Sequence, residues 1–72
     1  MSARPQKHSL TLKGHRTSVS LEPEFWGAFR EIATSEGKPV NALASEIDAV
    51  RDPNVGLASA IRVFVLERSR GR

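Results

Sequence analysis

Side chains alternate in character along residues 15–21. One set holds Thr17, Val19 and Leu21, and the other holds Arg16, Ser18 and Ser20. This period of two, with β-branched residues, predicts a short β-strand whose first set faces a core and whose second set faces away. A strand cannot be stable alone, because its backbone N–H and C=O groups need partners. The strand must therefore pair either within the chain, where residues 9–12 are a candidate, or with another copy.

The chain is short, with 72 residues, and it contains no cysteine. A domain of this size buries only about 60% of the surface of its unfolded chain, so a core shared with a second copy is an attractive solution. The absence of cysteine excludes disulfide scaffolds, thiolate zinc sites and cysteine nucleophiles. No apolar run approaches the roughly 20 residues that cross a bilayer, and no signal peptide is visible. We expect a cytoplasmic protein.

Two amphipathic helices follow the strand. Pro23 opens the first, whose apolar face includes Phe25, Phe29 and Ile32, and Gly37 ends it; we place it at about residues 23–36. Pro39 opens the second in the same way. Its apolar stripe runs from Val40 to Val50, and Asp52-Pro53 stops it, since proline biases its predecessor away from the helical region.

The segment 57–69 fits two patterns. Ile61, Val63 and Val65 alternate like a strand, whereas the wider apolar set fits one face of a helix. Ala58 and Ala60 favour the helix. We therefore predict a mainly helical fold with one short strand and a third, C-terminal helix.

Charge is concentrated at the two ends of the chain. The formal net charge is +3, but residues 1–16 carry Arg4, Lys7, Lys13 and Arg16 with no acidic residue. Residues 53–72 are also basic. Basic ends suit a polyanion ligand such as nucleic acid, although solubilising termini would have the same composition.

The sequence offers no credible catalytic or metal site. His8 and His15 are the two histidines, and no acidic residue lies within the first 21 residues. A metal site would need histidines grouped with carboxylates on a rigid element, and acid–base catalysis would need a pocket that so short a chain can hardly enclose. We expect no enzyme activity, no metal and no cofactor.

The stretch Gly14-His15-Arg16-Thr17-Ser18, followed by Leu21-Glu22 and Phe25-Trp26, resembles the ribbon-helix-helix family of bacterial DNA-binding proteins. It is similar to a subgroup of short members with this strand entry. The resemblance implies an intertwined homodimer in which two copies pair their strands as an antiparallel ribbon and four helices wrap one core. It divides the chain into a basic, partly flexible arm (1–14), a DNA-binding core (15–52), and a C-terminal helix with a basic tail (53–72).

The resemblance also implies roles for individual residues. The ribbon would enter the major groove of double-stranded DNA, and its outward residues would contact bases: Arg16, Ser18 and Ser20. Phosphates would be contacted near the ribbon and at the start of the second helix by Lys13, His15, Lys38, Val40 and Asn41. The dimer core would hold Val19, Leu21, Phe25, Phe29, Ile32, Leu43 and Ile47.

A transcriptional repressor is the function that this resemblance favours. Two alternatives keep the same dimer fold. In the first, the protein is an antitoxin and residues 53–72 bind a toxin protein. In the second, it is a protein-interaction adaptor that has lost DNA binding. We expect double-stranded DNA and a second copy as partners, with residues 53–72 as a candidate surface for another protein and no membrane partner.

Overall fold

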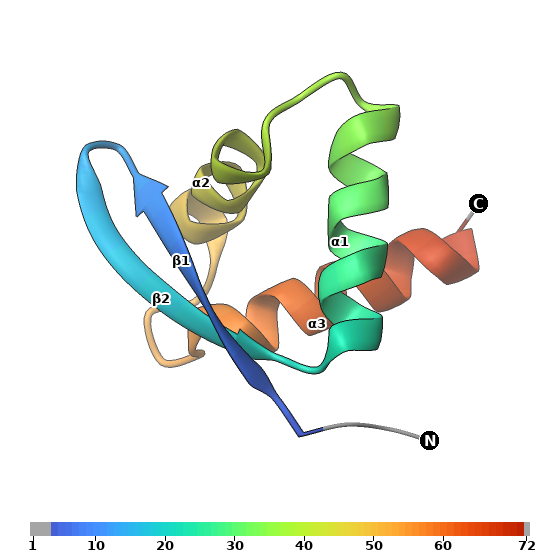
Figure 1. Cartoon of the computed structure of the whole chain (residues 1–72), viewed down its shortest axis with the longest axis horizontal. Coiled ribbons are helices and arrows are strands. Elements are labelled where there is room, and N and C mark those ends of the chain that lie inside the picture. Colours follow the sequence, from blue (N-terminus) through green and yellow to red (C-terminus); the bar gives the residue numbers. More distant parts are fainter. Residues whose placement is uncertain (1–3, 72) are drawn as a thin grey trace.

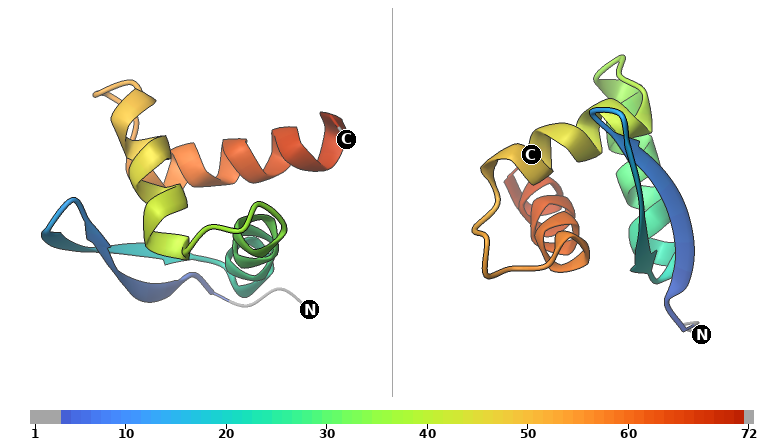
Figure 2. Two further views of the ribbon diagram at one scale, coloured as in Figure 1. Left: turned by 90° about the horizontal axis from the view of Figure 1, so that it is seen from above. Right: turned by 90° about the vertical axis from the view of Figure 1, so that its left-hand side faces the viewer.

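The computed structural model describes residues 4–71 as a β-hairpin followed by three helices (Figure 1). The strands are β1 (Gln6–Leu12) and β2 (His15–Leu21), and the helices are α1 (Pro23–Ser35), α2 (Val40–Val50) and α3 (Leu57–Gly71). The helices lie on one side of the hairpin, which Figure 2 shows from two further directions. Residues 1–3 of the expected arm and Arg72 of the expected basic tail lie outside the described residues.

The hairpin closes through a two-residue turn at Lys13-Gly14. Both residues have positive φ, 52° at Lys13 and 84° at Gly14. Two consecutive residues with positive φ make the type I′ turn, whose twist matches that of an antiparallel strand pair. Pairing then runs from Leu12 opposite His15 to Gln6 opposite Leu21, with Ser9 opposite Ser18 at its middle.

The hairpin corrects two expectations. We expected one short strand, whereas the chain has two and β2 pairs with β1; the homodimer stays a prediction. We also placed residues 1–14 in a partly flexible arm, whereas residues 6–12 of that segment are a regular strand. The physical reason is that β1 carries its own buried residues, Leu10 and Leu12, which are 3% and 8% exposed. Residues 9–12 were the intrachain candidate, and they lie within this strand.

The helices form where the apolar periodicity predicted them. Pro23 is the first residue of α1, and Gly37, with φ of 69°, follows its end. Pro39 precedes the first residue of α2, and Arg51 follows its last. Residues 57–69, which fitted two patterns, lie in helix α3, so the prediction of a helix there is confirmed.

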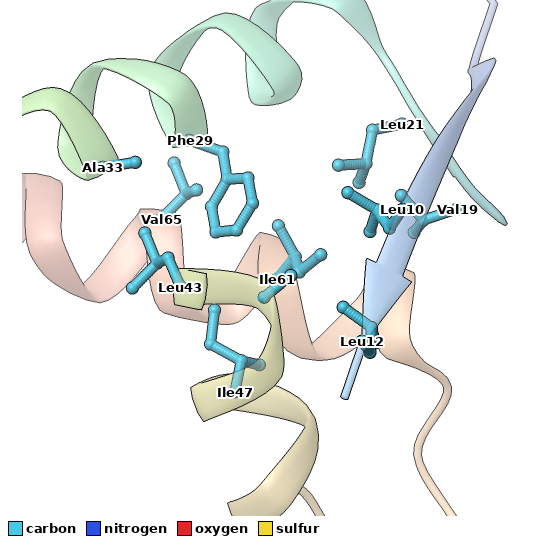
Figure 3. Packing of buried hydrophobic residues seen from close by; sticks show 11 residues of the cluster. Leu10, Leu12, Val19, Leu21, Phe29, Ala33, Leu43, Ile47, Ile61 and Val65 are labelled. Carbon is cyan, nitrogen blue, oxygen red and sulfur yellow. The ribbon is translucent and has the colours of Figure 1, made fainter. Parts of the chain in front are cut away.

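The core lies between the inner face of the hairpin and the three helices (Figure 3). Leu10, Leu12, Val19 and Leu21 point from the strands toward Phe29 and Ile61 on the helices. All seven residues predicted for the dimer core belong to this cluster within one chain. Phe25 and Ile32 are partly buried at its edge; the other five are buried: Val19, Leu21, Phe29, Leu43 and Ile47.

Two contacts fix the hairpin to helix α1 and helix α3. The ring of His8 on β1 stacks on Trp26 of α1, with ring centroids 3.9 Å apart and planes 7° apart. On α3, Arg62 donates to both carboxylate oxygens of Glu22 at 2.9 and 3.2 Å. Its guanidinium also reaches the carbonyl of Ser20 at 3.4 Å. The hairpin is therefore held by side chains of both α1 and α3.

Candidate nucleic-acid interface

The outward face of the hairpin is polar along its whole length. Residues that are directly opposite in an antiparallel pair share a face, so the register places Lys7 with Ser20, Ser9 with Ser18, and Thr11 with Arg16 on this side. All six side chains are exposed. The residues predicted to contact bases, Arg16, Ser18 and Ser20, therefore lie together on a face turned away from the helices.

Three further residues lie on this face, where sequence reasoning did not place them: Lys7, Ser9 and Thr11. They belong to β1, which was assigned to the flexible arm. One expectation for the inner face also differs, because Thr17 lies on that face by register but is exposed. Val19 and Leu21 are buried there as expected.

The start of α2 lies beside the hairpin. The side-chain oxygen Oδ1 of Asn41 accepts a hydrogen bond from the backbone N–H of Thr11 at 3.1 Å. Thr11 is opposite Arg16, so this bond brings the first turn of α2 next to a predicted base-contacting residue. The first N–H groups of a helix have no partner within it, and the helix dipole favours an anion there. The predicted phosphate contacts Val40 and Asn41 thus lie close to the ribbon.

The other predicted phosphate contacts differ in their surroundings. Lys13 is exposed in the hairpin turn, and His15 is exposed beside it on β2. The ammonium of Lys38, by contrast, is 2.8 Å from a carboxylate oxygen of Glu46 and 3.3 Å from one of Glu36. Its charge is already compensated, which weakens its attraction for a phosphate.

Most basic residues of the helices and loops are paired with carboxylates. Besides Lys38, Arg51 pairs with Asp48, Arg62 with Glu22, and Arg68 with Glu36. Within residues 4–71, five basic side chains have no carboxylate partner: Arg4, Lys7, Lys13, Arg16 and Arg30. All but Arg30 come from residues 4–16, so the uncompensated positive charge is concentrated on and beside the hairpin.

One carboxylate has a perturbed proton affinity. Hydrogen bonds from Arg62 hold the pKa of Glu22 below its ordinary value of 4.5, its own backbone N–H lowers it further, and partial burial opposes the shift. Glu22 therefore stays ionised and paired at neutral pH. In consequence, the first acidic residue after the hairpin adds little uncompensated negative charge near the ribbon.

The described residues contain no group of three or more histidines, cysteines or carboxylates placed to hold a metal ion. None of the helices in residues 4–71 is long and apolar enough to cross a membrane. The site is thus an exposed polar ribbon with basic residues beside it.

Comparison with protein families gives a match. The family described as ribbon-helix-helix domain matches residues 5–69, which include both strands and nearly all of α3. Comparisons with curated proteins and with solved structures give no match.

Proposed function

The chain belongs to the ribbon-helix-helix domain family, and from this premise we propose that it binds specific double-stranded DNA sequences and acts as a transcriptional repressor. Members of the family are typically DNA-binding transcription regulators or antitoxins and are generally not enzymes. In our proposal the outward face of the hairpin enters the major groove, which is wide enough for a two-stranded β-ribbon. Such a role would place the protein with the DNA in the cytoplasm.

The observation that carries this proposal is the distribution of uncompensated charge. Residues 4–16 contribute four basic side chains without a carboxylate partner in the described chain, whereas most cations on the helices are paired. Each phosphate that a basic residue neutralises releases condensed counterions, which supplies binding free energy. The charge is thus available on the element whose shape fits the groove.

Individual roles follow from the chemistry of each side chain. Arg16 would donate to O6 and N7 of a guanine, whereas Ser18 and Ser20 can donate or accept and so discriminate less strongly. Lys13 and His15 would contact phosphates beside the turn, and the N–H groups of Val40 and Asn41 would bind the next phosphate. Lys38 would add little unless a phosphate displaces its carboxylate partners.

We further propose that the protein acts as a homodimer, as members of its family usually do. The second copy would cover an apolar surface between α2 and α3. Large aliphatic side chains are exposed there: Val50 by 83%, Val63 by 52% and Val55 by 38%. Monomeric proteins rarely expose a large contiguous apolar surface, and such a surface usually marks an interaction site.

The same surface supports a second candidate function. Val55 and Val63 lie within residues 53–72, the segment that would bind a toxin if the protein were an antitoxin. Sedimentation equilibrium distinguishes the two proteins that could cover this surface, a second copy of the chain and a toxin. Self-association that is lost in Val63→Asp favours the homodimer, whereas a monomer that forms a complex only with a co-purified partner favours the antitoxin.

The experiment for the main proposal is selection of bound sequences from random DNA duplexes at near-physiological salt. We expect enrichment of an inverted-repeat motif. Arg16→Ala should then lower affinity for the selected site more than for random DNA, because it removes a base contact, whereas Lys13→Ala should weaken both similarly. If no sequence were enriched and the protein did not bind duplex DNA, a protein-interaction adaptor that has lost DNA binding would be the better interpretation.

A further inference from the structure

Two residues of β2 face inward and are nevertheless exposed. By the alternation along the strand, His15 and Thr17 share the inward face with Val19 and Leu21. Val19 and Leu21 are 4% and 0% exposed, whereas the side chains of His15 and Thr17 are open to solvent. The helices therefore cover the inward face of β2 only in its second half.

A cleft of about 270 Å³ lies beneath the uncovered half of this face. It opens where the turn end of the hairpin and helix α2 diverge (Figure 2), on the side of the hairpin away from the face proposed to enter the major groove. Pockets for small molecules usually start at about 300 Å³, so a ligand of this cleft must be small. The hairpin, the end of α2 and the start of α3 contribute its lining: Leu12, His15, Thr17, Asp48, Arg51 and Leu57.

The guanidinium of Arg51 is held in place by two hydrogen bonds. Its Nε donates to Oδ1 of Asp48 at 2.8 Å, and its Nη1 donates to the carbonyl of Val55 at 2.6 Å. A guanidinium carries five N–H donors in a fixed planar fork. Within residues 4–71, Nη2 has no hydrogen-bond partner. Arg51 is thus anchored by Nε and Nη1 and offers the two N–H groups of Nη2 to a ligand.

Two other polar side chains of the cleft also have free donors. In the part of the chain that the structure describes, neither the imidazole of His15 nor the hydroxyl of Thr17 makes a hydrogen bond. The carboxylate in the lining, that of Asp48, is already paired with Arg51. Leu12 and Leu57 add apolar surface. Free donors beside a compensated carboxylate and apolar carbon suit a ligand with one negative group and a small apolar body.

We propose that this cleft binds a small organic carboxylate. The carboxylate accepts hydrogen bonds from Arg51, Thr17 and His15. The apolar part of the ligand lies against Leu12 and Leu57. Hydrogen bonds between a guanidinium and a carboxylate are among the strong ones in proteins, because both partners are ionised. The bound ligand therefore joins the start of β2 to the end of α2.

An NMR titration of the natural protein with benzoate tests the site without DNA, so its outcome is independent of the proposed function. Benzoate carries a carboxylate on a small apolar ring, and benzamide is a neutral molecule of nearly the same shape. We expect benzoate to cause saturable shifts in the signals of His15, Thr17 and the Nε–H of Arg51, and benzamide to cause none. The proposal is wrong if benzoate causes no saturable shift, if benzamide acts equally, or if the shifts lie only outside the cleft.

Two substitutions locate the binding. Arg51→Met should weaken benzoate binding by about tenfold or more, because it removes a charged donor. Thr17→Val keeps the shape of the side chain and should weaken binding by about threefold, since it removes one neutral hydrogen bond. Thr17→Val also leaves the bonds of Arg51 intact, so it covers the case in which Arg51→Met does not fold. Arg30→Met, which removes an exposed cation of α1 outside the cleft, should have no effect. Affinity equal to that of the natural protein in both cleft variants would refute the proposal.

The phosphates of DNA are a second source of anions, and His15 lies beside the turn, so its imidazole can serve the carboxylate or a DNA phosphate. A salt titration with a random duplex separates the two sources at Arg51. Because Arg51 lies beneath the hairpin, Arg51→Met should leave the slope of log affinity against log salt unchanged. A slope that becomes less steep by about 1 would show that Arg51 contacts a DNA phosphate, and the assignment to a small carboxylate would then be overturned.

Discussion

The side-chain oxygen of Asn41 accepts a hydrogen bond from the backbone N–H of Thr11 at 3.1 Å, which ties the first turn of α2 to the edge of the hairpin. Asn41 was predicted from the sequence as a phosphate contact. Its side chain holds the edge of the hairpin, and its backbone N–H lies at the positive end of the helix. One residue therefore links the hairpin to the start of α2, the two elements that we propose contact DNA.

Two variants of Asn41 separate these roles. Asn41→Ala should lower the free energy of unfolding by about 1 kcal/mol, because it removes the acceptor for Thr11. Asn41→Asp keeps an acceptor and adds a negative charge that the helix start stabilises, so stability should be retained while DNA affinity falls. Urea denaturation and DNA titration measure the two effects. Equal loss of stability in both variants would contradict the role of this bond.

The Glu22–Arg62 pair predicts a pH dependence of stability. Because Arg62 holds the pKa of Glu22 below 4.5 in the folded chain, the stabilisation is complete above the pKa of the unfolded state. It is lost as pH falls through the lower folded-state pKa. The stability difference between the natural protein and Arg62→Met should thus be largest near pH 7 and shrink below about pH 4.5. Arg30→Met is the control, and an unchanged difference at pH 2 would contradict the pairing.

The hairpin turn depends on Gly14. Its φ of 84° is strained for any residue with a Cβ, although no atom lies within 4 Å of the position where a Cβ would be built. Gly14→Ala should therefore cost about 1–2 kcal/mol of stability through the backbone alone. Gly56→Ala, at a glycine with equally open space and no such φ, should cost less. Thermal unfolding of both variants measures the difference, and equal melting temperatures would contradict the turn assignment.

Lys13 and Lys38 should differ in their contribution to DNA affinity. Lys13 has no carboxylate partner in residues 4–71, whereas Lys38 lies between Glu36 and Glu46. Lys13→Ala should weaken binding to any duplex more than Lys38→Ala does. Glu46→Gln, which removes one partner of Lys38, should strengthen binding. Fluorescence titrations with one random duplex measure all three, and a larger loss for Lys38→Ala would reverse this ranking.

Local patterns predicted most of this fold. Pro23, Gly37 and Pro39 mark helix ends through constraints of their own backbone, and the bounds of β2 follow from alternation within seven residues. The partner of β2 was left open between residues 9–12 and a second copy, because strand pairing depends on contacts outside the strand. The alternation of Leu10 and Leu12 with polar residues was the available signal. Arg62 and Glu22 are 40 residues apart, and nothing in their local sequence indicates that they meet.

The salt dependence of binding tests most directly whether the outward face of the hairpin binds DNA. The affinity of the natural protein for duplex DNA should fall linearly on a double-logarithmic plot against salt, with a slope of about −0.9 for each phosphate neutralised. Replacing Lys13 by glutamine should make that slope less steep by about 1, because one phosphate contact is lost, whereas Arg30→Gln should not change it. An unchanged slope in Lys13→Gln, or affinity that does not depend on salt, would contradict DNA binding by the hairpin.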